Sequence, residues 1–349
     1  MMKHYEGIYQ ACHKNSLYSV TVQVDLSRLD RIWPILESHI QLAQGYSDGI
    51  LTLEPSNPYW PYFLVIQKRN PALTPKGVYE MRRRTYESVK VDGVLEPIEV
   101  FCDDEGVHYA HGHHRSAFSM QLGLPTIPCT IHACSKNLAD LATKIFSIYK
   151  EPLKYTTYQP VKHPFFELFP LHECNTCWDG KVKAVTIISC GWDKCIEIGA
   201  HFGMLTRAIE QEGTPCLATD LDASYVRLQP MFEKLGLRSI QYDLRSFAQI
   251  AEETSVSTNL VVMGLWHHFM GKPDLWGQAQ TTILPWMRTH VPEAIVEMSL
   301  LDVYQGTDPA VKVVSEEEVV AFWKQHGYDS RLIHAGTMRR HTYHLTVRR

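Results

Sequence analysis

The chain has 349 residues, of which 45% are hydrophobic and 21% charged, values typical of a soluble globular protein with room for two domains. A net charge of -4 argues against wholesale electrostatic binding to nucleic acid, and no apolar run reaches the ~18 residues of a membrane span. Nine cysteines at irregular spacings indicate a reducing compartment, and residues 1–6 lack the apolar core of a signal peptide. We therefore predict a cytoplasmic protein without a membrane partner.

The first half alternates short strand-like and helical segments, which predicts a small α+β domain over residues 1–150 with its core at 75–135. Alternating apolar residues between turn signals indicate strands at 18–24, 62–66, 97–101, 107–110 and 126–131. Helical patterns cover 28–44, 75–89, 115–122 and 137–149, and a loop rich in Pro and Tyr covers 54–62. Residues 151–180 are predicted to form a linker and a pre-domain segment.

The second half, residues 181–349, alternates strands and helices in the manner of a parallel, doubly wound α/β sheet. Strands are expected at 194–198, 216–220, 239–242, 259–263 and 294–298. A last helix at 315–326 begins with the capping-box sequence Ser315-Glu-Glu-Glu318. Segments 328–334 and 341–348 are expected to pair antiparallel and close the sheet.

The most informative motif is Cys195-Ile-Glu-Ile-Gly-Ala-His-Phe-Gly203, followed by Ala218-Thr-Asp-Leu-Asp222. An apolar run ends in an acid, enters a glycine-bearing turn and continues into a helix, and a second apolar run ends in Asp220. Glycines let the backbone approach a ligand, free N–H groups open the helix, and the second acid can accept ribose hydroxyls. The motif predicts a nucleoside site.

Residues 155–349 resemble a class I S-adenosylmethionine-dependent methyltransferase, with a Rossmann-like sheet. Glu197, Gly199 and Gly203 match the loop after the first strand, and His201 replaces its middle glycine. Four segments occur in the family's order, including Tyr242-Asp243-Leu244 and 261–268. The resemblance implies that S-adenosylmethionine is bound by Glu197, Gly199, Ala200, Gly203, Asp220, Leu221, Asp243, Leu244, Gly264, Tyr158 and Gln159. A nucleotide-binding fold with another ligand, such as a dehydrogenase, is the alternative.

Methyl transfer often needs a base for the acceptor, and His267 and His268 follow the fourth strand where such groups face the cofactor. Glu297, at the end of the fifth strand, is a further candidate catalytic residue. The alternative is that these side chains only cap or pack.

The first half resembles the ParB/sulfiredoxin superfamily over about residues 75–135. The residues that carry the likeness are 86–100 and His111-Gly-His-His-Arg-Ser-Ala-Phe118. The resemblance implies a nucleoside triphosphate, ATP or CTP with Mg²⁺, held by Gly112, His113, His114, Arg115 and Ser116. His113 stands where sulfiredoxins carry their reactive cysteine, so a small-molecule kinase fits better than that chemistry. A degenerate domain that only packs or recruits substrate is the alternative.

No metal site is predicted. The histidines at 111, 113 and 114 suit phosphate contact at a helix start, and Cys174 and Cys177 lack the second ligand pair of a structural zinc. The preferred hypothesis is a bifunctional enzyme that methylates a small metabolite or sugar, and a homodimer is the expected assembly. The alternatives are a nucleic-acid-directed methyltransferase with a ParB-like targeting domain, and a methyltransferase with a non-catalytic, nucleotide-gated domain.

Overall fold

The computed structural model describes residues 16–32, 37–49, 60–147, 155–300 and 315–348. The chain forms two compact units. The first contains Met1–Tyr155 and Lys162–Pro170, and the second contains Thr156–Val161 and Leu171–Arg349. Among the described residues, no helix is long and apolar enough to cross a bilayer.

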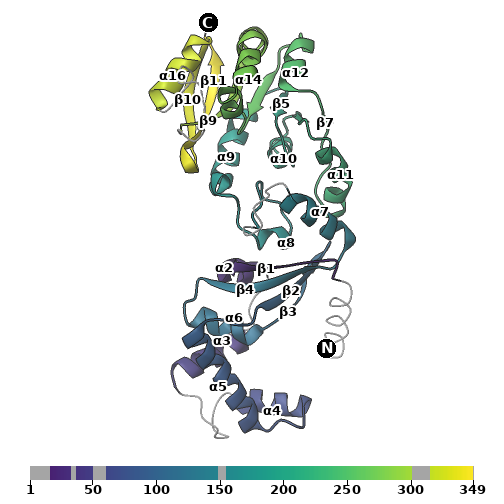
Figure 1. Ribbon diagram of the computed structural model, residues 1–349, viewed down its shortest axis with the longest axis vertical. Coiled ribbons are helices and arrows are strands. Elements are labelled where there is room, and N and C mark those ends of the chain that lie inside the picture. Colours follow the sequence, from purple (N-terminus) through teal and green to yellow (C-terminus); the bar gives the residue numbers. More distant parts are fainter. Residues whose placement is uncertain (1–15, 33–36, 50–59, 148–154, 301–314, 349) are drawn as a thin grey trace. The chain divides into compact units, whose positions relative to one another are not determined.

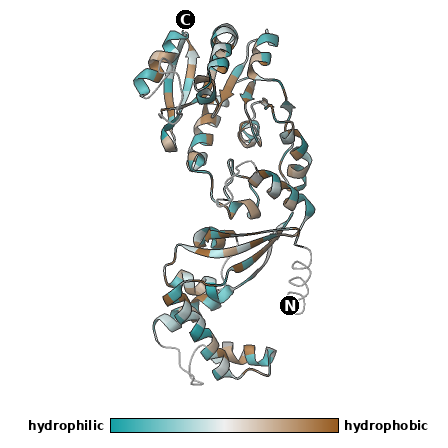
Figure 2. Ribbon diagram, in the orientation of Figure 1, coloured by the Kyte–Doolittle hydropathy of each residue, from teal (hydrophilic) through white to brown (hydrophobic). Residues whose placement is uncertain are grey.

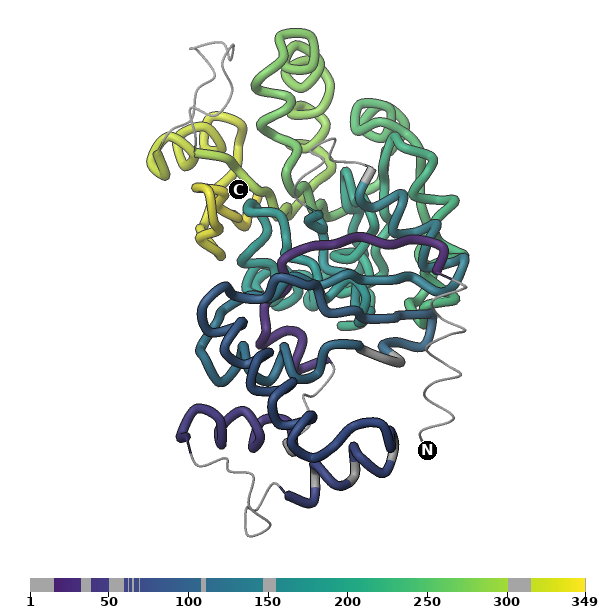
Figure 3. Tube along the Cα trace, turned by 60° about the horizontal axis from the view of Figure 1, so that its bottom comes forward, coloured from purple at the N-terminus to yellow at the C-terminus, as the bar shows by residue number. Residues whose placement is uncertain are grey.

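The first unit is built on a four-stranded sheet with the order β1-β4-β2-β3. Its strands are β1 (Tyr18–Asp25), β2 (Ile98–Asp103), β3 (Gly106–His111) and β4 (Thr126–Ala133). β1 and β3 run antiparallel to their neighbours, whereas β2 and β4 are parallel, and Figure 3 follows β1 in purple beside the blue strands. The four strands expected at 18–24, 97–101, 107–110 and 126–131 are confirmed.

Helices of this unit follow local signals in the sequence. They are α2 (Leu26–Ile32), α3 (Glu37–Ser47), α4 (Trp60–Arg69), α5 (Pro75–Asp92), α6 (His113–Gln121), α7 (Lys136–Ser147) and α8 (Pro164–Glu167). In α5, the Thr74 side chain accepts the Gly77 N–H, Pro75 occupies the first turn, and Gly93 ends the helix at φ 72. The helix expected at 28–44 is instead α2 and α3, with residues 33–36 outside the described part.

The expected strand at 62–66 is wrong, because these residues lie in α4. Phe63 is fully buried in a cluster with Leu42 of α3 and Val78 of α5. A short apolar run is compatible with a buried strand and with a buried helix. Here the packing of α4 against α3 and α5 favours the helix. The loop expected at 54–62 falls mostly outside the described residues, and its last residues begin α4.

The second unit is built on a seven-stranded sheet with the order β10-β11-β9-β8-β5-β6-β7 (Figure 1). The strands are β5 (Cys195–Ile198), β6 (Cys216–Thr219), β7 (Tyr242–Asp243), β8 (Asn259–Val262), β9 (Glu293–Ser299), β10 (Tyr328–Ala335) and β11 (Arg340–Val347). β5 to β9 are parallel, and β11 runs antiparallel to both β9 and β10. The doubly wound sheet and its closing antiparallel pair are thus confirmed, although the third strand is shorter than expected.

Helices join these strands. They are α9 (Trp178–Ser189), α10 (Met204–Gln211), α11 (Ser224–Lys234), α12 (Phe247–Glu253), α13 (Trp266–Met270), α14 (Pro273–Gln278), α15 (Leu284–His290) and α16 (Glu316–Gln325). The expected capping box opens α16, with Ser315 and Glu318 each bonded to the other's backbone N–H. Leu260, Val262 and Val296 are buried with Trp266 and Trp323, and Figure 2 colours the central strands as hydrophobic. This core fixes the strand ends that carry the site.

Candidate functional site

The glycine loop joins the carboxyl end of β5 to the start of α10. Gly199 and Gly203 have φ values of 72 and 70, in the region that favours glycine. A Cβ on Gly203 would lie 1.9 Å from Ile240 Cδ1, and one on Gly199 would lie 2.5 Å from Leu265 Cδ1. The loop therefore requires both glycines, for backbone conformation and for space.

His201 lies between the two glycines of the loop and adopts a positive φ of 56. Its N–H donates to Asp220 Oδ2 at 3.0 Å, and its carbonyl accepts from the Tyr242 hydroxyl at 2.5 Å. The imidazole lies beside the rings of Tyr158 and Tyr225, at centroid distances of 5.0 and 4.7 Å. Burial lowers the His201 pKa to about 4, so this ring is neutral at physiological pH.

Glu197 lies beneath the loop, buried within the unit. The Thr206 hydroxyl donates to its carboxyl group. Burial raises the Glu197 pKa to about 7, although the hydrogen bond from Thr206 opposes this shift. The expected cofactor residue therefore supports the loop from inside the protein.

Asp220 and Asp243 end neighbouring strands but differ in their partners. The Asp220 carboxylate accepts the backbone N–H groups of His201 and Asp222, which leaves lone pairs for ligand hydroxyls. Both oxygens of Asp243 are engaged by the Arg245 guanidinium, and Oδ1 also accepts the Arg245 backbone N–H. Asp243 thus has little acceptor capacity left for an adenine amine.

Two leucines beside these acids are unusually exposed. The exposed fractions are 70% for Leu221 and 44% for Leu244, each directly after one of the carboxylates. Exposed apolar side chains next to hydroxyl acceptors are what a nucleoside needs, because its base is flat and apolar and its ribose is polar.

Tyr158 and Gln159, which the sequence predicts as cofactor-binding residues, lie against the glycine loop. The Gln159 side chain donates to the Ala200 carbonyl at 3.2 Å and accepts the Met204 N–H at 3.3 Å. One amide therefore bonds both to the loop and to the first residue of α10. Tyr158 has a pKa raised to about 12, chiefly by burial, and stays neutral.

The candidate catalytic histidines lie in α13, directly after the strand end at Gly264. Gly264 has a φ of 65, and a Cβ there would lie 3.0 Å from the Tyr158 hydroxyl. Burial lowers the pKa of His267 to about 3 and also lowers that of His268, so both rings are neutral at physiological pH. The two rings lie 4.0 Å apart.

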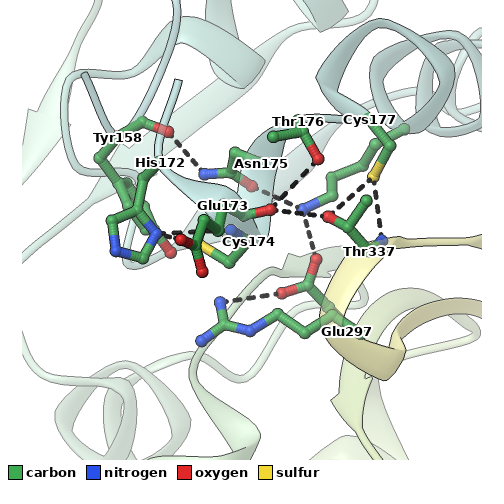
Figure 4. Close-up of polar contacts among 11 residues, drawn as sticks. Tyr158, His172, Glu173, Cys174, Asn175, Thr176, Cys177, Glu297 and Thr337 are labelled. Carbon is green, nitrogen blue, oxygen red and sulfur yellow. Dashed lines mark hydrogen bonds and ion pairs between the residues drawn. The ribbon is translucent and has the colours of Figure 1, made fainter. Parts of the chain in front are cut away.

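A group that we call the ionic cluster lies beside Gly264 and comprises Lys181, Glu297 and Arg340. Lys181 Nζ contacts Glu297 Oε2 and donates to Asn175 Oδ1 at 2.9 Å. Arg340 Nη1 lies 3.6 Å from Glu297 Oε1, and Figure 4 draws both contacts at the Glu297 carboxylate. Each Glu297 oxygen faces a cation, which favours a positioning role over proton transfer.

Sequence reasoning missed Lys181, Asn175 and Arg340. They come from three separate segments, and single charged residues on a helix or strand carry no motif. Glu297 and Lys181 are each only 2% exposed, which is unusual for charged side chains and draws attention to the cluster. Burial of this kind can be seen only in the folded structure.

In the first unit, α6 begins at Gly112, whose φ is 101 and whose Cβ would lie 2.7 Å from Ile98 Cγ2. Arg115 Nη1 donates to the carbonyls of Glu96 and Pro97 at 2.6 and 3.0 Å, so its guanidinium bonds within the protein. The Ser116 hydroxyl donates to the Gly112 carbonyl at 3.4 Å.

His39 of α3, which the sequence did not single out, lies beside the expected histidines of α6. Its ring centroid lies 5.3 Å from that of His113 and 4.5 Å from that of His114. Burial lowers the pKa of all three rings, and the positive charge of Arg82 adds to the shift at His39 and His114. Across the described residues, no group of three or more His, Cys, Asp or Glu side chains has the geometry of a metal site.

The residues of the second unit fit S-adenosylmethionine. Gly199 and Gly203 keep side chains out of the loop, and Asp220 retains acceptor capacity for ribose hydroxyls. Leu221 and Leu244 offer apolar surface for a base. Asp243, engaged by Arg245, is the departure from that pattern.

No protein-family model and no curated protein matches the chain. Among solved structures, the bifunctional kinase-methyltransferase WbdD is similar at 11% identity and a TM-score of 0.44, over 59% of this chain and 46% of that chain. The N-methyltransferase NodS from Bradyrhizobium japonicum WM9 is similar at 9% identity and a TM-score of 0.35, over 48% and 93%.

Magnesium protoporphyrin IX methyltransferase from Synechocystis PCC 6803, solved with bound SAM, is similar at 10% identity and a TM-score of 0.36, over 50% and 82%. The similarity to WbdD extends over about half of that protein's length. All three proteins are described as methyltransferases.

Proposed function

We propose that the second unit is an S-adenosylmethionine-dependent methyltransferase that acts on a small molecule. The observation that carries the proposal is the glycine loop at the carboxyl end of β5, where Gly199 and Gly203 leave room that side chains would fill. Open α/β sheets bind ligands beyond the carboxyl ends of their strands. Asp220 and Gly264 lie just beyond the ends of β6 and β8, and Glu297 lies within β9, two residues before its end at Ser299.

When bound, S-adenosylmethionine supplies an electrophilic methyl group. In this proposal Asp220 binds the ribose hydroxyls, and Leu221 and Leu244 cover the base. His267 and His268 are neutral imidazoles, the form that accepts a proton from an acceptor hydroxyl or amine. His268 is the better candidate base, because its ring is more exposed and that of His267 is held at a low pKa.

Calorimetric titration with S-adenosylhomocysteine tests the cofactor site. We expect Asp220→Ala to weaken binding by about tenfold or more, because a charged acceptor of hydroxyl donors is lost. Asp243→Ala is the matched control and should weaken binding by less than about threefold, since Arg245 already occupies its carboxylate. Equal affinity of the Asp220→Ala variant and the unaltered protein would contradict the proposal.

As a second candidate function, we propose that the first unit binds the phosphates of a nucleoside triphosphate at the start of α6. The supporting observation is Arg82, whose buried Nε meets no hydrogen-bond acceptor within the described residues and which acts on His39 and His114. A half-buried arginine whose buried Nε meets no acceptor among the described residues, beside a helix N-terminus, favours an anion. The same proposal includes a kinase activity, in which this unit transfers a phosphoryl group from the bound nucleotide to a small molecule.

Calorimetry of the full chain with ATP or CTP and Mg²⁺ checks the second candidate. Arg82→Gln should weaken nucleotide binding by about tenfold, whereas Arg83→Gln, at the exposed neighbouring position, should leave it unchanged. Absence of binding of both nucleotides to the unaltered protein would refute it.

A further inference from the structure

The ionic cluster carries more positive than negative charge. Lys181 and Arg340 contribute two cations and Glu297 one carboxylate, so 2 − 1 leaves one positive charge. The neighbouring Tyr158 and His267 are neutral at physiological pH and do not alter the count. A buried charge is costly unless it is paired, so the excess calls for a counter-ion.

The excess charge is located on Arg340. Lys181 already neutralises Glu297 and donates to Asn175, which accounts for its burial. Arg340 Nη1 lies 3.6 Å from Glu297, beyond hydrogen-bond distance, and it is buried with no hydrogen-bond acceptor in the described part of the chain. The guanidinium also interacts with the Tyr158 side chain, and its Nη1 keeps a donor that no described residue accepts.

Arg340 also lies beside the proposed cofactor site. Its Nη1 is 3.7 Å from where a Cβ on Gly264 would be, and the next residue, Leu265, contacts Gly199 of the glycine loop. Tyr158 connects the two regions, because its hydroxyl faces Gly264 while its ring packs on His201. A molecule bound at Arg340 would thus lie next to the cofactor loop and to the α13 histidines.

We infer that the methyl acceptor carries a carboxylate and that the guanidinium of Arg340 binds it. This inference rests on the proposed methyl transfer and names its substrate class. A carboxylate matches the planar fork of arginine, and its single negative charge balances the single excess charge, whereas a phosphate dianion would exceed it. Glu297 acts as a positioning residue that holds Arg340 beside Gly264.

The probes are acetate and benzoate, with acetamide and benzamide as neutral counterparts of the same shape. Each is titrated into the full chain saturated with S-adenosylhomocysteine, and binding is followed by ligand-observed NMR. We expect at least one carboxylate to bind about tenfold more tightly than its amide. Arg340→Gln should remove that difference, and Arg340→Lys should keep part of it because the charge stays while the fork is lost.

Arg331→Gln, which removes an exposed arginine from the neighbouring strand, is the matched control and should bind the carboxylate as the unaltered protein does. Binding of S-adenosylhomocysteine to each variant reports that it is folded. If the nucleoside binds but neither carboxylate is preferred over its amide, or if Arg340→Gln and Arg340→Lys both keep the full preference, the inference is overturned and the methyltransferase proposal stands. If the carboxylate binds at Arg340 but the nucleoside does not, the anion site stands and methyl transfer fails.

Discussion

Glu197 is an ionisable group that the fold keeps away from water. Its carboxyl group is buried under the glycine loop and accepts a hydrogen bond from Thr206. Burial places its folded-state pKa at about 7, above the ~4.3 of a glutamate in an unfolded chain. The stability that this group contributes is therefore fully present below the unfolded-state pKa and is lost as the pH rises to about 7.

We predict that the free energy of unfolding falls by about 3 kcal/mol between pH 4.5 and 7 on account of Glu197, at ~1.4 kcal/mol per pH unit. Glu197→Gln keeps the shape and the Thr206 contact but cannot ionise, so this part of the slope should disappear. Urea unfolding at several pH values measures it, with the exposed Glu252→Gln as a control that should keep the full slope. Parallel slopes for Glu197→Gln and the unaltered protein would disprove the prediction.

At the residue scale, the sequence predicted the groups that belong to a contiguous motif. Gly199, Gly203 and Asp220 could be predicted because a turn needs glycine and a strand end exposes its acid, and both requirements are local. Lys181 and Arg340 could not, since their importance comes from meeting Glu297 across long stretches of chain. The roles of all these residues stay predictions until binding is measured.

At the scale of elements, the junction of β5 and α10 depends on Gly203 in two ways. Its φ of 70 disfavours any other residue, and a Cβ would overlap Ile240. Gly236, after α11, has a similar φ of 77 but nothing within 4 Å of its Cβ position. Substitution of Gly236 therefore measures the cost of the positive φ alone, and substitution of Gly203 measures that cost together with the steric overlap.

We expect Gly236→Ala to cost about 1–2 kcal/mol of unfolding free energy, from the positive φ alone. Gly203→Ala should cost about 1–3 kcal/mol more, because Ile240 must move, and it should also weaken S-adenosylhomocysteine binding. Chemical denaturation and calorimetry measure the two effects. Equal destabilisation by both substitutions would contradict the prediction, because it would mean that a Cβ at position 203 does not overlap Ile240.

Elements with a full set of local sequence signals were predicted correctly. Helix α4, which lacks such signals, was wrongly predicted to be a strand. The capping box of α16 and the alternation in β2 determine structure within a few residues. The apolar run around Phe63 has no capping or turn signal. Its helical conformation is favoured by packing on Leu42 and Val78, which lie outside the run. Tertiary contacts overrode the local preference there.

At the scale of the whole molecule, the chain passes between its two units more than once. Lys162–Pro170 belong to the first unit although Thr156–Val161, just before them, belong to the second. The prolines of 151–170 predict a linker, but Phe166 and Phe169 within it are buried and pack with Phe146. Composition alone does not reveal which unit such a short apolar segment completes.

This interleaving bears on how the protein is made and divided. During synthesis the first unit lacks part of its core until Pro170 has left the ribosome. Thr156–Val161 have left the ribosome by then, but the rest of the second unit, on which they pack, has not yet been made. A gene cut after Tyr155 would leave Phe146 without Phe169, and a cut after Pro170 would take Gln159 from the glycine loop. No single cut at these crossing points yields two whole units, so neither can be exchanged between proteins as one uninterrupted stretch of sequence.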